Sequence, residues 1–224
     1  MIQINSLYFS YTKSAPFTLS NIDLTINDGE YISILGENGC GKSTLIKLIL
    51  NILSPTEGTI LNSSKRIGYV PQKSDDFNSK FPITVYEMLN CYRKILKIKD
   101  KTVIDKSLGM VNMLDFKNAL VGTLSGGQFQ KILIIRALIG NPSLLILDEP
   151  STGVDINSQN DIYGFIKNLN KNHRITVISI EHNLGAAITN STLIYHLRNG
   201  NGHLCTPDSY AKEYLKSNKN PLLL

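Results

Sequence analysis

The sequence predicts an α/β fold with an N-terminal antiparallel β subdomain and a helical subdomain inserted into its core. Three observations lead to this prediction. Apolar and polar residues alternate within 1–30, a short apolar run enters a glycine-rich loop at 36–44, and three helix signals follow one another over about 74–138. Because no linker is long enough to separate independent domains, we expect a single domain over residues 1–224.

The first part of the chain predicts strands around one loop and one helix. Ile2 and Ile4 alternate with polar residues, and Ile22, Leu24 and Ile26 repeat the pattern. The expected elements are antiparallel strands within 1–30, a buried strand at 31–35, a helix at 43–53, a turn at 54–58 and a short strand at 66–70.

The rest of the chain alternates helices with buried strands. Thr84, followed three residues later by Glu87, is typical of a capping box, and it predicts a helix that runs to about residue 98. The further expected elements are helices at 103–114, 130–139 and 161–170, strands at 143–147 and 175–180, a hairpin over 193–205 and a short helix within 208–224.

Composition limits the class of protein. Hydrophobic residues make up 42% of the chain, which is ordinary for a globular protein, and no stretch reaches the ~18 apolar residues of a membrane helix. The N-terminus lacks the features of a signal peptide, and the three cysteines are far apart, so we expect a cytoplasmic protein without a disulfide framework. The net charge of +5 comes mostly from scattered lysines, which favours a solvated surface over a nucleic-acid site.

The loop after the buried strand at 31–35 predicts the chemistry. Gly36, Gly41, Lys42 and Ser43 fit the pattern G-x-x-x-x-G-K-[ST] in its required place between a strand and a helix. Glycines let backbone N–H groups surround an anion, and the helix N-terminus adds partial positive charge. We expect Lys42 to reach the β- and γ-phosphates and Ser43 to ligate Mg²⁺. A glycine-rich turn without a ligand is the alternative.

Two further motifs identify a family. The apolar strand Leu144–Leu147 ends in Asp148 and Glu149, where an acid can hold Mg²⁺, although these acids could instead cap the next helix. Leu124–Gln128 reads Leu-Ser-Gly-Gly-Gln. Together with the phosphate loop, these motifs resemble the ATP-binding cassette (ABC) family over nearly the whole chain and in the same order. The resemblance implies a P-loop NTPase core of the ABC nucleotide-binding type.

The resemblance implies contacts with ATP in four parts of the chain. Tyr11 would stack on adenine, Gly36–Thr44 would be the Walker A loop, Ser125–Gln128 the signature motif, and Asp155 part of the D-loop. The loop and signature residues are Gly36, Glu37, Asn38, Gly39, Cys40, Gly41, Lys42, Ser43 and Thr44, and Ser125, Gly126, Gly127 and Gln128. For Tyr11 the alternative is a tyrosine at a strand edge with no ligand.

It also implies the catalytic residues. Glu149 would orient or polarise the attacking water, Asp148 would lie near Mg²⁺, and Gln72 would meet Mg²⁺ and the γ-phosphate. Lys42 would hold the phosphates, and His182 would contact the γ-phosphate. This sequence departs from the family pattern at two places: Lys131 stands where arginine is common, and Glu181-His182-Asn183 replaces the usual Ser-His-Asp. The second departure concerns the local geometry around His182.

The resemblance also implies partners. The signature motif completes the site of an opposite subunit, so we expect a homodimer, or a pair with a related chain, that holds two ATP molecules. Without membrane helices of its own, the chain would act on permease subunits from the inner face of the cell membrane, docking them through about residues 74–100. A solute-binding protein would be an indirect partner, and nucleic acid is not expected.

Two segments indicate what is moved. Ile67–Lys73 with Phe81–Glu87, and Gly153–Gln159, look like the corresponding regions of zinc and manganese importer ATPases. We therefore expect ATP hydrolysis that powers import of zinc or manganese. The alternatives are an exporter ATPase, an importer of another substrate, or a non-transport ATPase that acts on ribosomes or DNA. Proteins of that last class usually carry two cassettes in one chain or a long coiled-coil insertion, and this sequence has neither.

Overall fold

The computed structural model describes residues 1–72 and 81–217, with side chains to residue 213. The chain divides into two compact units. Unit 1 comprises Met1–Ser64 and Thr176–Leu224, and unit 2 comprises Lys65–Ile175. The helices expected over 74–138 all belong to unit 2, together with two strands and a long helix outside that range.

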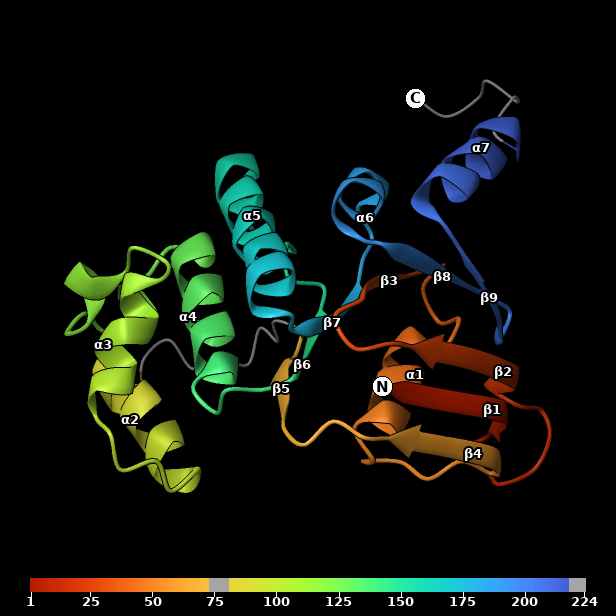
Figure 1. The fold of residues 1–224 in the computed structure, drawn as a ribbon, viewed down its shortest axis with the longest axis horizontal. Coiled ribbons are helices and arrows are strands. Elements are labelled where there is room, and N and C mark those ends of the chain that lie inside the picture. The colour runs from red at the N-terminus through yellow and green to blue at the C-terminus, as the bar shows by residue number, and fades with distance from the viewer. Residues whose placement is uncertain (73–80, 218–224) are drawn as a thin grey trace. The chain divides into compact units, whose positions relative to one another are not determined.

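Unit 1 contains an antiparallel sheet of β1 (Ile2–Phe9), β2 (Leu19–Ile26) and β4 (Glu57–Asn62), in the order β2-β1-β4 (Figure 1). The antiparallel strands predicted within 1–30 are confirmed by pairs such as Ile2 with Ile26. The third strand, β4, was not predicted, because none of its residues is fully buried and no apolar alternation marks it.

Unit 1 also contains β3 (Tyr31–Leu35), β7 (Thr176–Ile180), β8 (Leu193–Arg198) and β9 (Asn201–Cys205). Strands β7 and β8 both pair parallel to β3, and β9 returns antiparallel to β8 as the predicted hairpin. Every residue of β3 and β7 is buried. Because parallel strands end at the same edge, the segments that follow β3, β7 and β8 gather there.

Three helices complete unit 1. They are α1 (Lys42–Ile49), α6 (Leu184–Asn190) and α7 (Pro207–Ser217). Helix α1 was predicted to continue to residue 53, but Asn51 takes a positive φ of 57°, which ends it earlier. Helix α6 was not predicted; it is seven residues long and begins where the Asn183 side chain accepts a hydrogen bond from the Ala186 N–H.

Unit 2 pairs β5 (Ile67–Val70) parallel to β6 (Leu144–Asp148). Its helices are α2 (Val85–Ile95), α3 (Thr102–Gly109), α4 (Gly126–Leu138) and α5 (Ile156–His173), with short 3-10 turns η1 (Leu114–Phe116) and η2 (Val121–Thr123). The Thr84–Glu87 capping box is present. Among the described residues, no helix has both the length and the apolar character needed to cross a membrane.

Two predicted helix starts in unit 2 were wrong. Helix α4 begins at Gly126 rather than at residue 130, because Ser125 and Gln128 form a second capping box. Helix α5 begins at Ile156 rather than at residue 161, because the Asp155 side chain accepts from the Ser158 N–H. Gly126–Gln128 of the signature motif therefore form the first turn of α4, and Asp155 of the D-loop is the N-cap of α5.

Candidate functional site

The phosphate loop joins β3 to α1 in unit 1, and packing requires glycine at two of its positions. A Cβ on Gly36 would lie 2.2 Å from the Leu197 carbonyl oxygen of β8. At Gly41, which has a φ of +106°, a Cβ would lie 2.6 Å from the Leu19 Cδ2. The loop therefore keeps a path that only a chain without side chains at these positions can follow.

Lys42 lies inside the curve of this loop. Its side chain is buried, and its Nζ donates to the carbonyl oxygens of Gly36 at 2.8 Å and Glu37 at 3.0 Å. The N-terminus of α1 points its first N–H groups into the same region, and Gly41 has no side chain with which to cap them. An ammonium group beside uncapped backbone donors fits the phosphates of a nucleotide.

Tyr11 lies beside the phosphate loop. Its hydroxyl is 3.1 Å from the Thr44 Oγ1, and its ring packs edge-to-face on Phe9 with ring centroids 4.9 Å apart. The residue is 62% exposed. This places an accessible aromatic ring next to the loop, as stacking on adenine requires; the stacking itself stays a prediction.

His182 follows β7 at the same sheet edge as the phosphate loop. A cavity of about 450 Å³ is lined by residues that follow β3 and β7 and by residues of β8, among them Gly36, Glu37, His182 and His196. Glu181, the residue before His182, is only 2% exposed, and its carboxylate accepts a hydrogen bond from the Ser179 hydroxyl. The structure thus brings His182 and the start of the loop to one cavity within unit 1.

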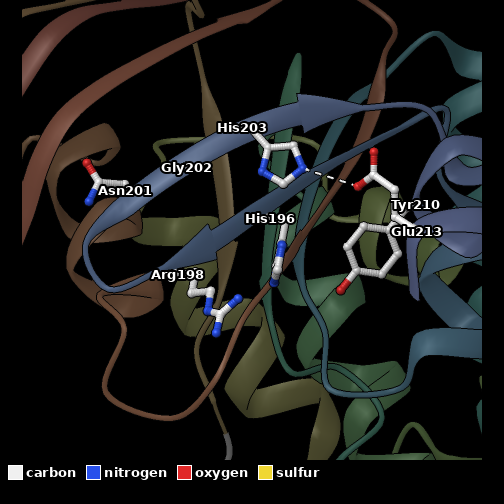
Figure 2. A pocket seen from close by; sticks show the side chains of 7 residues that line it. All are labelled: His196, Arg198, Asn201, Gly202, His203, Tyr210 and Glu213. Carbon is white, nitrogen blue, oxygen red and sulfur yellow. Dashed lines mark ion pairs between the residues drawn. The ribbon is translucent and has the colours of Figure 1, made fainter. Parts of the chain in front are cut away.

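A second cavity of about 520 Å³ shares His196, Arg198 and Tyr210 with the first (Figure 2). The rings of His196 and His203 lie 5.5 Å apart between centroids, and the His203 Nε2 is 3.9 Å from the Glu213 Oε2. Burial, and then the positive charges of His203 and Arg198, lower the pKa of His196. Sequence reasoning missed this cavity, because two strands and a helix contribute its residues.

In unit 2, Glu149 follows β6 and takes a positive φ of 53°. The Glu149 Oε2 accepts two hydrogen bonds, from the Gln72 Nε2 at 2.8 Å and from the Thr152 Oγ1 at 3.0 Å. The structure therefore brings together Gln72 and Glu149, which lie 77 residues apart in the sequence. Both residues were predicted from the sequence to take part in ATP hydrolysis. The Thr152 contact was not predicted.

Asp148 is the last residue of β6 and is 5% exposed. Burial, and then the negative charge of Asp148, raise the pKa of Tyr69 on the paired strand β5. The Asp148 carboxylate and the Ser43 hydroxyl both offer hard oxygen ligands, which are the ligands that Mg²⁺ prefers, so the chemistry of these groups fits Mg²⁺.

The signature motif and the D-loop are packed together in unit 2. The Ser125 Oγ accepts from the Gln128 N–H at 3.2 Å, and the Gln128 Oε1 accepts from the Ser125 N–H at 2.9 Å. A Cβ on Gly127 would lie 2.5 Å from the Ser158 Cβ. The Ser158 N–H in turn donates to the Asp155 carboxylate, which lowers the pKa of Asp155.

The strand–loop–helix cradle of unit 1 and the acidic strand end of unit 2 define a P-loop nucleotide-binding protein. The profile of the ABC transporter family matches residues 19–152, more than half of the chain. The chain belongs to the ABC transporter family, as its motifs predicted, and it has the α/β nucleotide-binding fold of that family.

Known proteins resemble the chain over most of its length. A "Probable metal transport system ATP-binding protein" of Treponema pallidum (strain Nichols) is 51% identical, covering 99% of this chain and 93% of that protein. The high-affinity zinc uptake system ATP-binding protein of Bacillus subtilis (strain 168) is 41% identical, covering 81% and 84%. The structure also matches a chain from an inward-facing ABC transporter assigned to the metal-chelate type, with a TM-score of 0.84, 28% identity and coverage of 93% and 84%.

Proposed function

We propose that this chain is the ATP-binding and ATP-hydrolysing subunit of an ABC transporter that powers import of a divalent metal ion, zinc or manganese, through separate membrane permease subunits. The observation that carries the hydrolytic part is the Glu149 carboxylate, held by two side-chain donors directly after the buried Asp148. The names of the Treponema and Bacillus relatives support a metal ion as the substrate that is moved.

In this proposal the phosphate loop binds the triphosphate of ATP. The N–H groups of Gly36–Thr44 and the buried Lys42 ammonium supply donors and positive charge to the phosphate oxygens. Tyr11 stacks on the adenine. When bound, Mg²⁺ adds positive charge at the phosphates, and Ser43, Gln72 and Asp148 would supply its oxygen ligands.

Hydrolysis of ATP is mainly a matter of positioning and charge stabilisation. Glu149 orients and polarises the attacking water, because its carboxylate accepts a hydrogen bond from that water. Lys42 stabilises negative charge that develops on the phosphates, and His182 donates a hydrogen bond to the γ-phosphate. Gln72 donates a hydrogen bond to Glu149 and precedes the proposed permease-docking region in the sequence.

The proposal includes an assembly. The phosphate loop and the signature motif Ser125–Gln128, with Asp155, each occur once in the chain, which supports a homodimer or a pair with a related chain. We place the assembly on the cytoplasmic face of the membrane, with permease subunits and, indirectly, a solute-binding protein. The predicted docking region at 74–100 lies partly outside the described residues; within the described part, Phe81 is 62% exposed.

Metal uptake in cells that lack the native chain tests the proposal. Cells would carry the wild type, Lys42→Ala, or the control Lys47→Ala, which changes an exposed lysine of the same helix. Uptake of labelled zinc and of labelled manganese would be measured after metal starvation, and ATP hydrolysis would be measured on each purified variant.

We expect Lys42→Ala to abolish uptake of one metal, which names the substrate, and Lys47→Ala to leave uptake unchanged. If hydrolysis is lost while uptake of both metals is normal, the proposal that the chain powers zinc or manganese import is wrong, and the ATPase assignment stands. Accumulation of a solute inside the Lys42→Ala cells would identify an exporter instead.

A further inference from the structure

We propose that Thr152 is a positioning residue for ATP hydrolysis that acts through the carboxylate of Glu149. This inference rests on the proposed function, in which Glu149 orients the attacking water. It adds a residue to which the motif resemblance gives no individual role.

The contact itself is the first observation. The Thr152 Oγ1 donates to the Glu149 Oε2 at 3.0 Å, and the Gln72 Nε2 donates to the same oxygen at 2.8 Å. Hydrogen bonds to an ionised carboxylate are stronger than those between neutral groups. Because two donors from separate segments meet one oxygen, the orientation of the carboxylate is restricted.

The position of Thr152 is fixed by the turn that follows β6. The Thr152 N–H donates to the Glu149 carbonyl oxygen at 3.2 Å, so two hydrogen bonds join the same two residues, one through the backbone and one through the side chains. Glu149 has a positive φ of 53°, a conformation that few non-glycine residues adopt. The turn over Glu149–Thr152 therefore returns the Thr152 hydroxyl to the carboxylate three residues earlier.

Helix α5 holds this turn in place. The Gln159 amide donates to the carbonyl oxygens of Ser151 at 3.2 Å and Val154 at 2.8 Å. The Tyr163 hydroxyl donates to the Ser151 Oγ at 2.9 Å. Gln159 and Tyr163 are four residues apart on one face of α5, so an 18-residue helix anchors both sides of Thr152.

Thr152 is itself exposed, so no packed core depends on its side chain. What threonine supplies here is a hydroxyl donor on a β-branched side chain with few rotamers. Removal of the hydroxyl is therefore expected to change the orientation of Glu149 and to leave the fold intact.

The test compares Thr152→Val, which has the same shape without the hydroxyl, with Thr152→Ser, which keeps it. Thr59→Val on the exposed strand β4 is the matched control. We expect Thr152→Val to lower kcat about tenfold, equivalent to about 1.4 kcal/mol, with an unchanged KM for ATP and an unchanged Tm. Thr152→Ser should recover most of kcat, and Thr59→Val should behave as the wild type.

A Glu149→Gln background separates this inference from the proposed function. If Thr152 acts through the Glu149 carboxylate, adding Thr152→Val to Glu149→Gln lowers the residual rate no further. A full additional tenfold loss in that background, a wild-type kcat for Thr152→Val, or a raised KM with unchanged kcat would each overturn the inference. Normal hydrolysis by Glu149→Gln alone would instead remove Glu149 from its proposed role, and the Thr152 inference with it.

Discussion

The two units hold their candidate nucleotide-binding residues in place by different kinds of contact. In unit 1 the phosphate loop is shaped by its backbone, and a Cβ at Gly36 or Gly41 would collide with a neighbouring strand. In unit 2 the decisive contacts are between side chains, and Gln72 and Thr152 both bind Glu149. Binding a phosphate depends on the path of the main chain, whereas orienting a water depends on the direction of one carboxylate.

The largest expected effect is in unit 2. Glu149→Gln keeps the shape of the side chain but removes the negative charge, so we expect turnover to fall at least ~100-fold, the usual lower range for loss of a general base. ATP binding should be retained, because the phosphate loop belongs to unit 1 and the substitution changes none of its residues. Phosphate release and equilibrium ATP binding would be measured on the same preparation.

Glu57→Gln, at an exposed position of β4, is the control for this substitution and should hydrolyse ATP normally. A Glu149→Gln protein that binds ATP weakly but turns over at the normal rate would reverse the comparison between the two units.

Unit 1 should respond in the opposite way. Gly36→Ala places a Cβ 2.2 Å from the Leu197 carbonyl oxygen, a backbone atom that moves only with strand β8. We expect the affinity for ATP to fall about tenfold, which is about 1.4 kcal/mol, while bound ATP is still hydrolysed. Isothermal titration with ATP and single-turnover hydrolysis would separate these effects.

Gly164→Ala is the matched control, because apart from its chain neighbours and the adjacent backbone of helix α5 no atom lies within 4 Å of its Cβ position. Alanine is the better helix former there, so the free energy of unfolding should rise by about 0.5–1 kcal/mol with ATP affinity unchanged. Equal losses of affinity in the two glycine variants would show that the close approach at Gly36 does not shape the site.

The sequence predicted the parts of the fold that local pattern determines. Alternation and buried apolar runs marked β1–β3 and β6–β8, and residue spacing marked the phosphate loop. Strand β4 was missed because it is paired at the edge of its sheet with no buried face of its own. The starts of α4 and α5 were misplaced because Ser125 and Asp155 act as N-caps. Ser125 and Gln128 fit the capping-box pattern, but the two glycines between them are poor helix formers.

The candidate site divides in the same way. Motif spacing predicted Lys42, Asp148, Glu149 and His182, since each follows a recognisable strand. The bond from Thr152 to Glu149 depends on the positive φ of Glu149, which no residue pattern specifies for a glutamate. Contacts that are set by an unusual backbone angle, or by segments far apart in the chain, had to come from the structure.

Unit 2 also contains a glycine whose close packing can be tested, as the glycines of the phosphate loop can in unit 1. Gly127 of the signature motif has no room for a Cβ, which would lie 2.5 Å from the Ser158 Cβ. We expect Gly127→Ala to destabilise the protein by about 1–3 kcal/mol, as overpacking does, and to lower turnover several-fold. Urea unfolding and steady-state hydrolysis would measure the two effects.

Ser158→Gly supplies the compensation. It removes the side chain that the new Cβ meets and keeps the N–H that donates to Asp155. The double variant Gly127→Ala/Ser158→Gly should therefore recover part of the turnover lost in Gly127→Ala. A double variant no better than the single one would show that the loss comes from the signature motif itself, not from the packing of α4 on α5.

The smallest expected effect concerns pH and the second cavity of unit 1. Burial, followed by His203 and Arg198, lowers the pKa of His196 below its ordinary value of 6.5, against the opposing charges of Glu213 and Glu37. The unfolded chain therefore binds a proton at a higher pH than the folded chain does. His196 contributes full stability above pH 6.5, and that contribution is lost as the pH falls from 6.5 through the lower pKa of the folded state.

Replacing His196 with glutamine removes this linkage. The urea midpoint of His196→Gln should fall less steeply than that of the wild type between about pH 6.5 and pH 5, whereas the two slopes should agree between pH 7 and pH 8. Identical slopes for the two proteins below pH 6.5 would mean that the cavity in Figure 2 does not hold His196 in its neutral form.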